Sequence, residues 1–333
     1  MTHRIPLAFS YDPLGPGVSL AALALAALAL WLYLRGLARP RRLRPEPSLW
    51  QQGFFGGGIL LILAASNAPL APLGQSLFSV HQVAHLLLRL VGPLLIAVSQ
   101  PWGIFHAALP RRWRGRSRAL DRARLTRWMR HPAVATALLI GALYIWQIPA
   151  LFGLARHVAV VEFAAHLGMA LAGLWFFAIL LDPRDPPEGA RRGARLLAGF
   201  VVIVSNILLG SLTTLKEVVL YSAHRAATWD GQLSPISDEA IGGYTIWVPS
   251  SMVMIAAIIL VFNGWNRAEE RRWNARHTVM RQSNAAALEF PETAAELRMK
   301  VAKPNRDMGR TLAFGALAMF AIVVVTAITV LSL

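Results

Sequence analysis

Cysteine is absent from this 333-residue sequence, and charged residues are scarce, at 15% of the chain. The first absence excludes disulfides, cysteine-ligated zinc and iron–sulfur clusters. The second, beside a hydrophobic fraction of 56%, excludes a disordered chain and argues against an ordinary soluble enzyme, because globular chains carry about 25% charged residues. Acidic residues are fewer than basic residues, with 17 Asp and Glu against 33 Lys and Arg. Because the basic residues lie between long apolar runs, we expect a lipid bilayer as the partner and no nucleic acid.

The apolar runs have the length that a bilayer requires. A transmembrane helix needs about 20 predominantly apolar residues, and the sequence holds eight such runs. We therefore expect an all-α, polytopic membrane helix bundle of about eight transmembrane helices, forming one integral membrane domain over residues 1–333. Short turns join the second span to the third and the fourth to the fifth, as in helical hairpins. The predicted spans are 17–34, 53–72, 76–98, 133–153, 158–181, 196–217, 240–263 and 311–333.

Basic residues are concentrated in alternate loops, and 28 of the 33 Lys and Arg lie in four of them. These loops follow the first, third, fifth and seventh predicted spans, and the loops on the other side hold few basic residues. By the positive-inside rule the basic loops are cytoplasmic, so both termini are expected on the outer side of a bacterial inner membrane. Arg4 alone precedes the first span and five arginines follow it, the reverse of a signal peptide, which predicts an uncleaved anchor.

The last basic loop, 264–310, has a partly helical pattern. Two interpretations of it are equally good. The loop lies along the anionic inner surface of the membrane, or it is a solvated connector to the final span.

Histidines occur inside the predicted spans, where ionisable side chains are costly and indicate a function by default. In the third span His81, His85 and Arg89 recur at every fourth residue, so all three project from one face of the helix. Two imidazoles at this spacing lie about 5–6 Å apart at Cβ, which lets both bind one ion. A packing role is the simpler explanation for any single histidine, but two on one face favour a metal or proton-linked role.

The fifth span adds a third histidine at a similar depth. Glu162, His166 and Met169 share one face of this helix, which also starts from the outer side. His157 precedes the span and His224 follows the sixth span, again on the outer side. Five of the nine histidines are therefore expected in the outer half of the protein.

Several histidines beside a glutamate and a methionine predict a metal site that faces the periplasm. Imidazole suits zinc, copper and iron, and a nearby thioether favours Cu(I), so we expect copper with zinc as the alternative metal. Glu162 would hold an N–H of a ligand or balance charge. It is also the expected partner of Arg89, which lies near mid-membrane and needs a counter-charge or an aqueous cavity. The predicted ligands are His81, His85, His166, His157 and His224, with Glu162 and Met169 as supporting residues.

Four segments, in order, resemble the multi-spanning CtaG-type cytochrome c oxidase assembly factors. They read SVHQVAHLLLRLVGPLLIAVSQP, HPAVATALLIGALYIWQIPALF, HLGMALAGLWFFAILLDP and DEAIGGYTIWVPSSMVMI, and they fall within a family-like core of residues 53–263. His81, His85 and His166 match the histidines of the family, whereas Arg89 stands at a position expected to be apolar. His157 and His224 match no position of the pattern, and 264–310 and 311–333 resemble an extension. The late family motif is matched by Asp238, a further supporting residue, and by Gly242, Gly243, Trp247 and Pro249.

The resemblance implies a membrane protein that helps to assemble a haem–copper oxidase by handling copper. The partners would be an immature oxidase subunit and a periplasmic copper donor, and the chemistry would be ligand exchange, so we expect no enzymatic activity. The oligomeric state stays open.

Two alternatives use the same residues. A redox protein could hold haem b between His85 and His166, although His81 would then be redundant. A transporter could move protons or a metal ion, although the third span is wholly apolar after Arg89.

Overall fold

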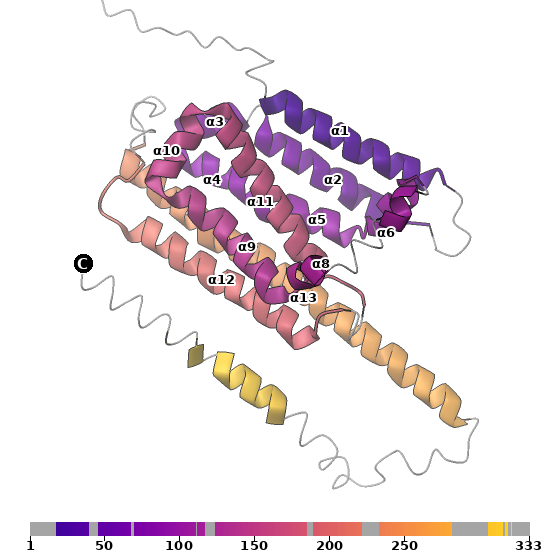
Figure 1. Cartoon of the computed structure of the whole chain (residues 1–333). Helices are drawn as coiled ribbons and strands as arrows, with labels where there is room; N and C mark the ends of the chain where they lie inside the picture. The colour runs from indigo at the N-terminus through magenta and orange to yellow at the C-terminus, as the bar shows by residue number, and fades with distance from the viewer. Residues whose placement is uncertain are drawn as a thin grey trace, which may run out of the picture.

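The computed structural model is built of helices, and no strand occurs among the residues that it describes (Figure 1). The predicted all-α class is therefore confirmed for this part of the chain. The described residues are 18–39, 46–67, 70–110, 112–116, 124–184, 189–221, 233–281, 306–315, 317–318 and 321.

The helices of the first half of the chain are α1 (Val18–Leu37), α2 (Leu49–Ser66), α3 (Leu70–Ser76), α4 (Phe78–Leu86), the π-helix η1 (Leu87–Val91), α5 (Gly92–Val98) and α6 (Trp102–Ala108). Those of the second half are α8 (Arg124–Met129), α9 (Pro132–Tyr144), the short 3-10 helix η2 (Ile145–Gln147), α10 (Pro149–His157), α11 (Ala159–Leu180), α12 (Arg192–Leu215) and α13 (Pro235–Arg281).

Six helices of the described residues are long and apolar enough to cross a membrane, or seven if the bent pair formed by α9 and α10 counts as one span. These seven correspond to the first seven spans predicted from the sequence. The predicted eighth span, 311–333, lies mostly outside the described residues and stays a prediction. The outward orientation of the termini stays a prediction as well.

The span predicted as 133–153 is broken near its C-terminal end. The helical stretch Pro132–Gln147 and the helix α10 are bent by 79° relative to each other. Pro149 is the first residue of α10. It lacks the amide hydrogen that would continue the preceding helix, but it is well suited to begin a new one. The chain therefore turns here, and α10 does not extend the axis of α9.

The predicted turn around 73–75 is helical instead. Leu70–Ser76 forms α3, and Pro72 lies in its first turn, where a missing amide hydrogen costs no helical hydrogen bond. Helix α3 contacts the next helix at Gly74, where a Cβ would lie 3.4 Å from the Cα of His81, an ordinary van der Waals distance. Arg156 at the end of α10 donates hydrogen bonds to the carbonyl oxygens of Gly74 and Gln75. Helices α3 and α10 are thus tied together at one end of the bundle (Figure 1).

The continuous stretch α4–η1–α5 is the centre of the bundle. In the apolar 18-residue window within Phe78–Val98, 61% of the residues are buried, the largest share among the candidate spans. It packs against α2 and α11 through small residues that let the backbones approach. A Cβ at Gly58 would lie 2.8 Å from the carbonyl oxygen of Gly92, and a Cβ at Gly173 would overlap the carbonyl oxygen of Arg89.

Helix α12 packs against the first part of α13 (Figure 1). A Cβ at Gly210 would lie 2.6 Å from the side chain of Trp247, so glycine is needed for this approach. Pro249 lies inside α13 and cannot donate to the carbonyl oxygen of Thr245. The hydroxyl of Ser250 donates to that oxygen instead, at 3.4 Å, which lets the helix continue through the proline.

Helix α13 extends well past the span predicted as 240–263 and ends at Arg281. The predicted helical character of the basic segment 264–310 is therefore confirmed for its first part, and the extension projects away from the other helices in Figure 1. Residues 282–305 lie outside the described residues.

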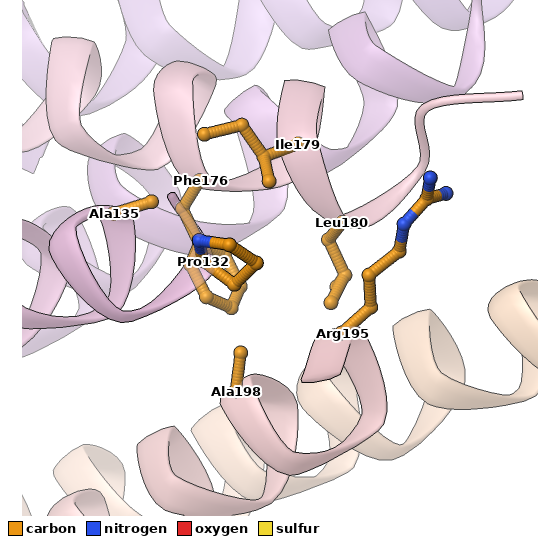
Figure 2. A pocket seen from close by; sticks show the side chains of 7 residues that line it. All are labelled: Pro132, Ala135, Phe176, Ile179, Leu180, Arg195 and Ala198. Atoms are coloured by element: carbon orange, nitrogen blue, oxygen red, sulfur yellow. The ribbon is translucent and has the colours of Figure 1, made fainter. Parts of the chain in front are cut away.

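The C-terminal end of α11 is held by Arg195 of α12. Its guanidinium donates to the backbone carbonyl oxygens of Asp182, Arg184 and Ala190. Figure 2 shows this guanidinium pointing away from the apolar side chains around Phe176 and Leu180. Because the guanidinium is engaged in this way, the apolar gap between α9, α11 and α12 offers no polar group to a ligand.

Candidate metal centre

Three histidines from two helices meet inside the bundle. His81 and His85 lie on α4 and His166 lies on α11, and one ring nitrogen of each lies within 4.8 Å of the other two. The ring centroid of His85 is 4.2 Å from that of His81 and 5.6 Å from that of His166. Among the described residues, no other group of three or more His, Cys, Asp or Glu could hold a metal ion.

The three rings differ in their exposure. His85 and His166 are buried, with 3% and 7% of their surface exposed, and His81 is half-buried. The ring of Phe152, on α10, lies edge-on to His81 with the centroids 5.1 Å apart. Phe78 and Tyr221 stack on each other beside Phe152. An aromatic cluster therefore borders His81, while His85 and His166 lie deeper.

The N-terminus of α4 is capped from a distant part of the chain. Leu77, the residue before this helix, provides no side-chain cap. The carboxylate of Asp238 on α13 takes its place and accepts hydrogen bonds from the backbone N–H of Phe78 at 2.6 Å and of Ser79 at 3.0 Å. It also accepts one from the hydroxyl of Ser79 at 2.6 Å. Asp238 thus holds the first turn of the helix that carries His81 and His85.

The neighbouring carboxylate, Glu239, holds the segment that follows α12. It accepts hydrogen bonds from the backbone N–H of Leu220 at 3.1 Å and of Tyr221 at 2.9 Å, and it forms an ion pair with Lys216. Sequence reasoning missed Glu239. The adjacent acids Asp238 and Glu239 at the start of an apolar run were the available signal.

A series of hydrogen bonds connects Tyr221 to α4, the helix that carries His81 and His85. The hydroxyl of Tyr221 donates to Gln147, whose backbone and side-chain oxygens lie 2.8 Å and 2.9 Å away. The amide of Gln147 in turn donates to Gln82 at 2.8 Å. Burial raises the pKa of Tyr221 to about 12, so its hydroxyl remains a donor at neutral pH. Because Gln82 follows His81 directly, these hydrogen bonds hold α4 at a second point, in addition to the cap by Asp238.

The predicted pair of Arg89 with Glu162 is wrong. Arg89 is fully buried, and its Nη2 donates to Oδ1 of Asn206 on α12 at 3.0 Å. Glu162 lies in the first turn of α11, where Arg156 is the cation that interacts with it. The error was one of depth. Arg89 lies about 12 Å beyond His81 along the continuous α4–η1 stretch, whereas Glu162 lies about 6 Å before His166, towards the N-terminus of α11.

The other predicted site residues have different positions. Met169 is fully buried one turn beyond His166. His157 is exposed at the end of α10 and is not part of the histidine group. His224 lies outside the described residues. The structure therefore brings together the three histidines that recur in the family pattern.

A comparison with protein-family models identifies the family of this chain. Residues 31–268 match the family model described as cytochrome c oxidase caa3 assembly factor. This chain belongs to that family. The predicted resemblance is therefore confirmed, and the match includes both helices that carry the histidines.

The chain is also similar to longer proteins of mycobacteria. The chain is 26% identical over 258 residues to an uncharacterized protein of Mycobacterium leprae, a match that covers 72% of this chain and 38% of the relative. It is 26% identical over 226 residues to an uncharacterized protein of Mycobacterium bovis, covering 64% and 34%. The chain thus spans little more than a third of the length of these relatives. No solved structure matches it.

Proposed function

We propose that this oxidase assembly factor binds copper, with Cu(I) favoured, through His81, His85 and His166, and delivers it to an immature haem–copper oxidase subunit. The mutual distance of at most 4.8 Å between the three ring nitrogens is the observation that carries the proposal. Three nitrogens at this separation can surround a single ion. The family description supports an oxidase as the recipient.

The chemistry of the donor set fits copper. Neutral imidazole binds copper and zinc well, and neither a thiolate nor a carboxylate belongs to the group. Nδ1 of the buried His85 has no hydrogen-bond partner among the described residues, so this nitrogen is not engaged by the protein. Met169 lies on the same face as His166, where a thioether would favour Cu(I) over Zn(II).

The unequal exposure of the rings suggests a route for transfer. His81 is half-buried, and His85 and His166 are buried, so an ion would first meet His81 and would also leave by way of it. Such a transfer exchanges one ligand for another and needs no catalytic group. A periplasmic donor and the oxidase subunit would approach the same end of the bundle, where α3 and α10 lie.

The geometry favours a single ion over a haem. A haem with two axial histidines needs the imidazoles on opposite faces of its ring. Here the centroids of His85 and His166 are 5.6 Å apart, and the ring of His81 lies 4.2 Å from that of His85. A macrocycle between His85 and His166 would have to displace His81.

The test is the copper content of the detergent-purified protein after loading with Cu(I), measured by elemental analysis. We expect about one copper per chain in the wild type and its loss in His81→Ala/His85→Ala and in His166→Ala. His157→Ala is the matched control, because this histidine is exposed and lies outside the group, and it should keep its copper. Equal copper in wild type and both ligand variants would contradict the proposal. A Soret band in the purified wild type would favour the haem alternative.

A further inference from the structure

Arg89 is a buried cation in the middle of the bundle. It is 2% exposed and lies in the π-helix Leu87–Val91, a type of helical irregularity that is frequent at functional sites. A guanidinium keeps its charge in proteins, and a charge at this depth in a membrane is costly unless it is compensated. A group close to Arg89 must therefore balance its positive charge.

The protein supplies Arg89 with a single neutral acceptor. Oδ1 of Asn206 accepts from Nη2, and this is the only hydrogen bond that the guanidinium of Arg89 makes within the described part of the chain. No carboxylate of the described residues forms an ion pair with it. The charge of Arg89 is thus solvated by one amide dipole and is not neutralised by the side chains described.

The two residues together offer donors and no free acceptor. Nε and Nη1 of Arg89 and Nδ2 of Asn206 are all buried and have no hydrogen-bond partner among the described residues. Asn206 is completely buried and lies on α12, whereas Arg89 lies on η1. The donors therefore come from two helices, which the hydrogen bond between Arg89 and Asn206 joins. A set of buried N–H donors around one positive charge is the arrangement that binds an anion.

We propose that Arg89 and Asn206 form a binding site for one small monovalent anion of the halide class. One negative charge balances the one positive charge of the guanidinium. The close packing of α11 on η1, where a Cβ at Gly173 would overlap the carbonyl oxygen of Arg89, favours a monatomic ion over a bulky organic one. This inference does not depend on copper binding, because it concerns the metal-free protein.

The first experiment compares the melting temperature of the metal-free, detergent-purified protein in chloride, bromide and gluconate at equal ionic strength. Gluconate is too bulky for the site. We expect chloride and bromide to raise the melting temperature by about 2 °C at tenfold excess over the dissociation constant. Equal melting temperatures in chloride and gluconate would overturn the proposal.

The variant Asn206→Asp tests the same site without removing the arginine. A carboxylate of nearly the same shape would neutralise Arg89 from within, so the variant should be more stable than wild type in gluconate and indifferent to chloride. Asn266→Asp is the matched control, because Asn266 is exposed on α13, and it should keep the full response to chloride. An undiminished chloride response in Asn206→Asp would overturn the proposal.

A direct binding measurement covers the case in which Asn206→Asp fails to fold. Wild-type protein is equilibrated with radioactive chloride and the bound ion is counted, with bromide as the competitor. About one chloride per chain, displaced by bromide, supports the site. No bound chloride at the concentrations that cells contain would overturn it, whatever the result of copper loading.

Discussion

The carboxylate of Asp238 accepts a hydrogen bond from the hydroxyl of Ser79 at 2.6 Å and from its backbone N–H at 3.0 Å, across 159 positions of the chain. The last long helix therefore supplies the cap of the helix that carries His81 and His85. Because a helix begins with unpaired N–H groups, this contact links the position of both histidines to the packing of α13.

Removal of this cap should weaken both the fold and the metal site. Asp238→Ala is expected to lower the stability by about 0.5–2 kcal/mol and the Cu(I) affinity by about 10-fold or more, and Asp238→Asn by less, because an amide keeps one acceptor oxygen. A melting curve and competition with a chromophoric Cu(I) chelator measure the two effects. The exposed Asp307→Ala is the control, and a normal copper affinity in Asp238→Ala would show that the cap does not position the ligands.

A pair of glycines on α11 gives a matched test of how closely this helix must approach η1. Gly173→Ala would place a Cβ against the carbonyl oxygen of Arg89 and 2.9 Å from Cγ of Pro93. It should push α11 away from α4 and separate His166 from the other ligands. Gly168→Ala, on the same helix, meets no atom within 4 Å and should be neutral or stabilising by up to about 1 kcal/mol. The measurements are the melting temperature and the copper content of the two variants. Similar values for both variants would show that the close approach of α11 to η1 does not require Gly173.

Glu162→Gln should be well tolerated. The carboxylate is half-buried near the start of α11 and interacts with Arg156, not with Arg89. Loss of a partly exposed electrostatic interaction of this kind costs about 0–1 kcal/mol. The variant should accumulate in membranes and melt within a few degrees of the wild type. Failure of Glu162→Gln to accumulate would contradict this expectation and would support the pairing of Glu162 with Arg89 that the structure excludes.

The hydroxyl of Tyr221 should contribute a pH-dependent part of the stability. Burial raises its pKa to about 12 from an ordinary value of 10, so the protonated form is the one that the folded protein favours. Its stabilisation is complete below pH 10 and is lost as the pH rises from 10 through 12. Tyr221→Phe leaves the oxygens of the buried Gln147 without this donor and should cost about 1–3 kcal/mol at pH 7.

The measurement is the difference in melting temperature between wild type and Tyr221→Phe as a function of pH. This difference should shrink above pH 10. Tyr244→Phe is the control, since Tyr244 is exposed on α13, and its difference from the wild type should stay small at every pH. If the difference in melting temperature between wild type and Tyr221→Phe does not change with pH, ionisation of the Tyr221 hydroxyl does not affect the stability.

The sequence by itself determined the class of the protein and the ligand candidates. Long apolar runs and alternating basic loops are local features, so they predicted the helices of the first seven spans. The spacing of His81 and His85 predicted a shared face because helical periodicity is local too. The depth count also placed His166 at their level, and the structure brings the three rings together.

The tertiary structure alone decided the contacts between distant segments. Three pairs join different segments of the chain, from 74 to 159 positions apart: Asp238 with Ser79, Arg89 with Asn206, and Tyr221 with Gln147. Periodicity predicts which face of a helix is polar but not which neighbour that face meets, because helix rotation and neighbour choice depend on the packing of the whole bundle. The sequence therefore predicted the three candidate ligands, whereas the cap of the helix that carries His81 and His85 and the partner of Arg89 required the fold.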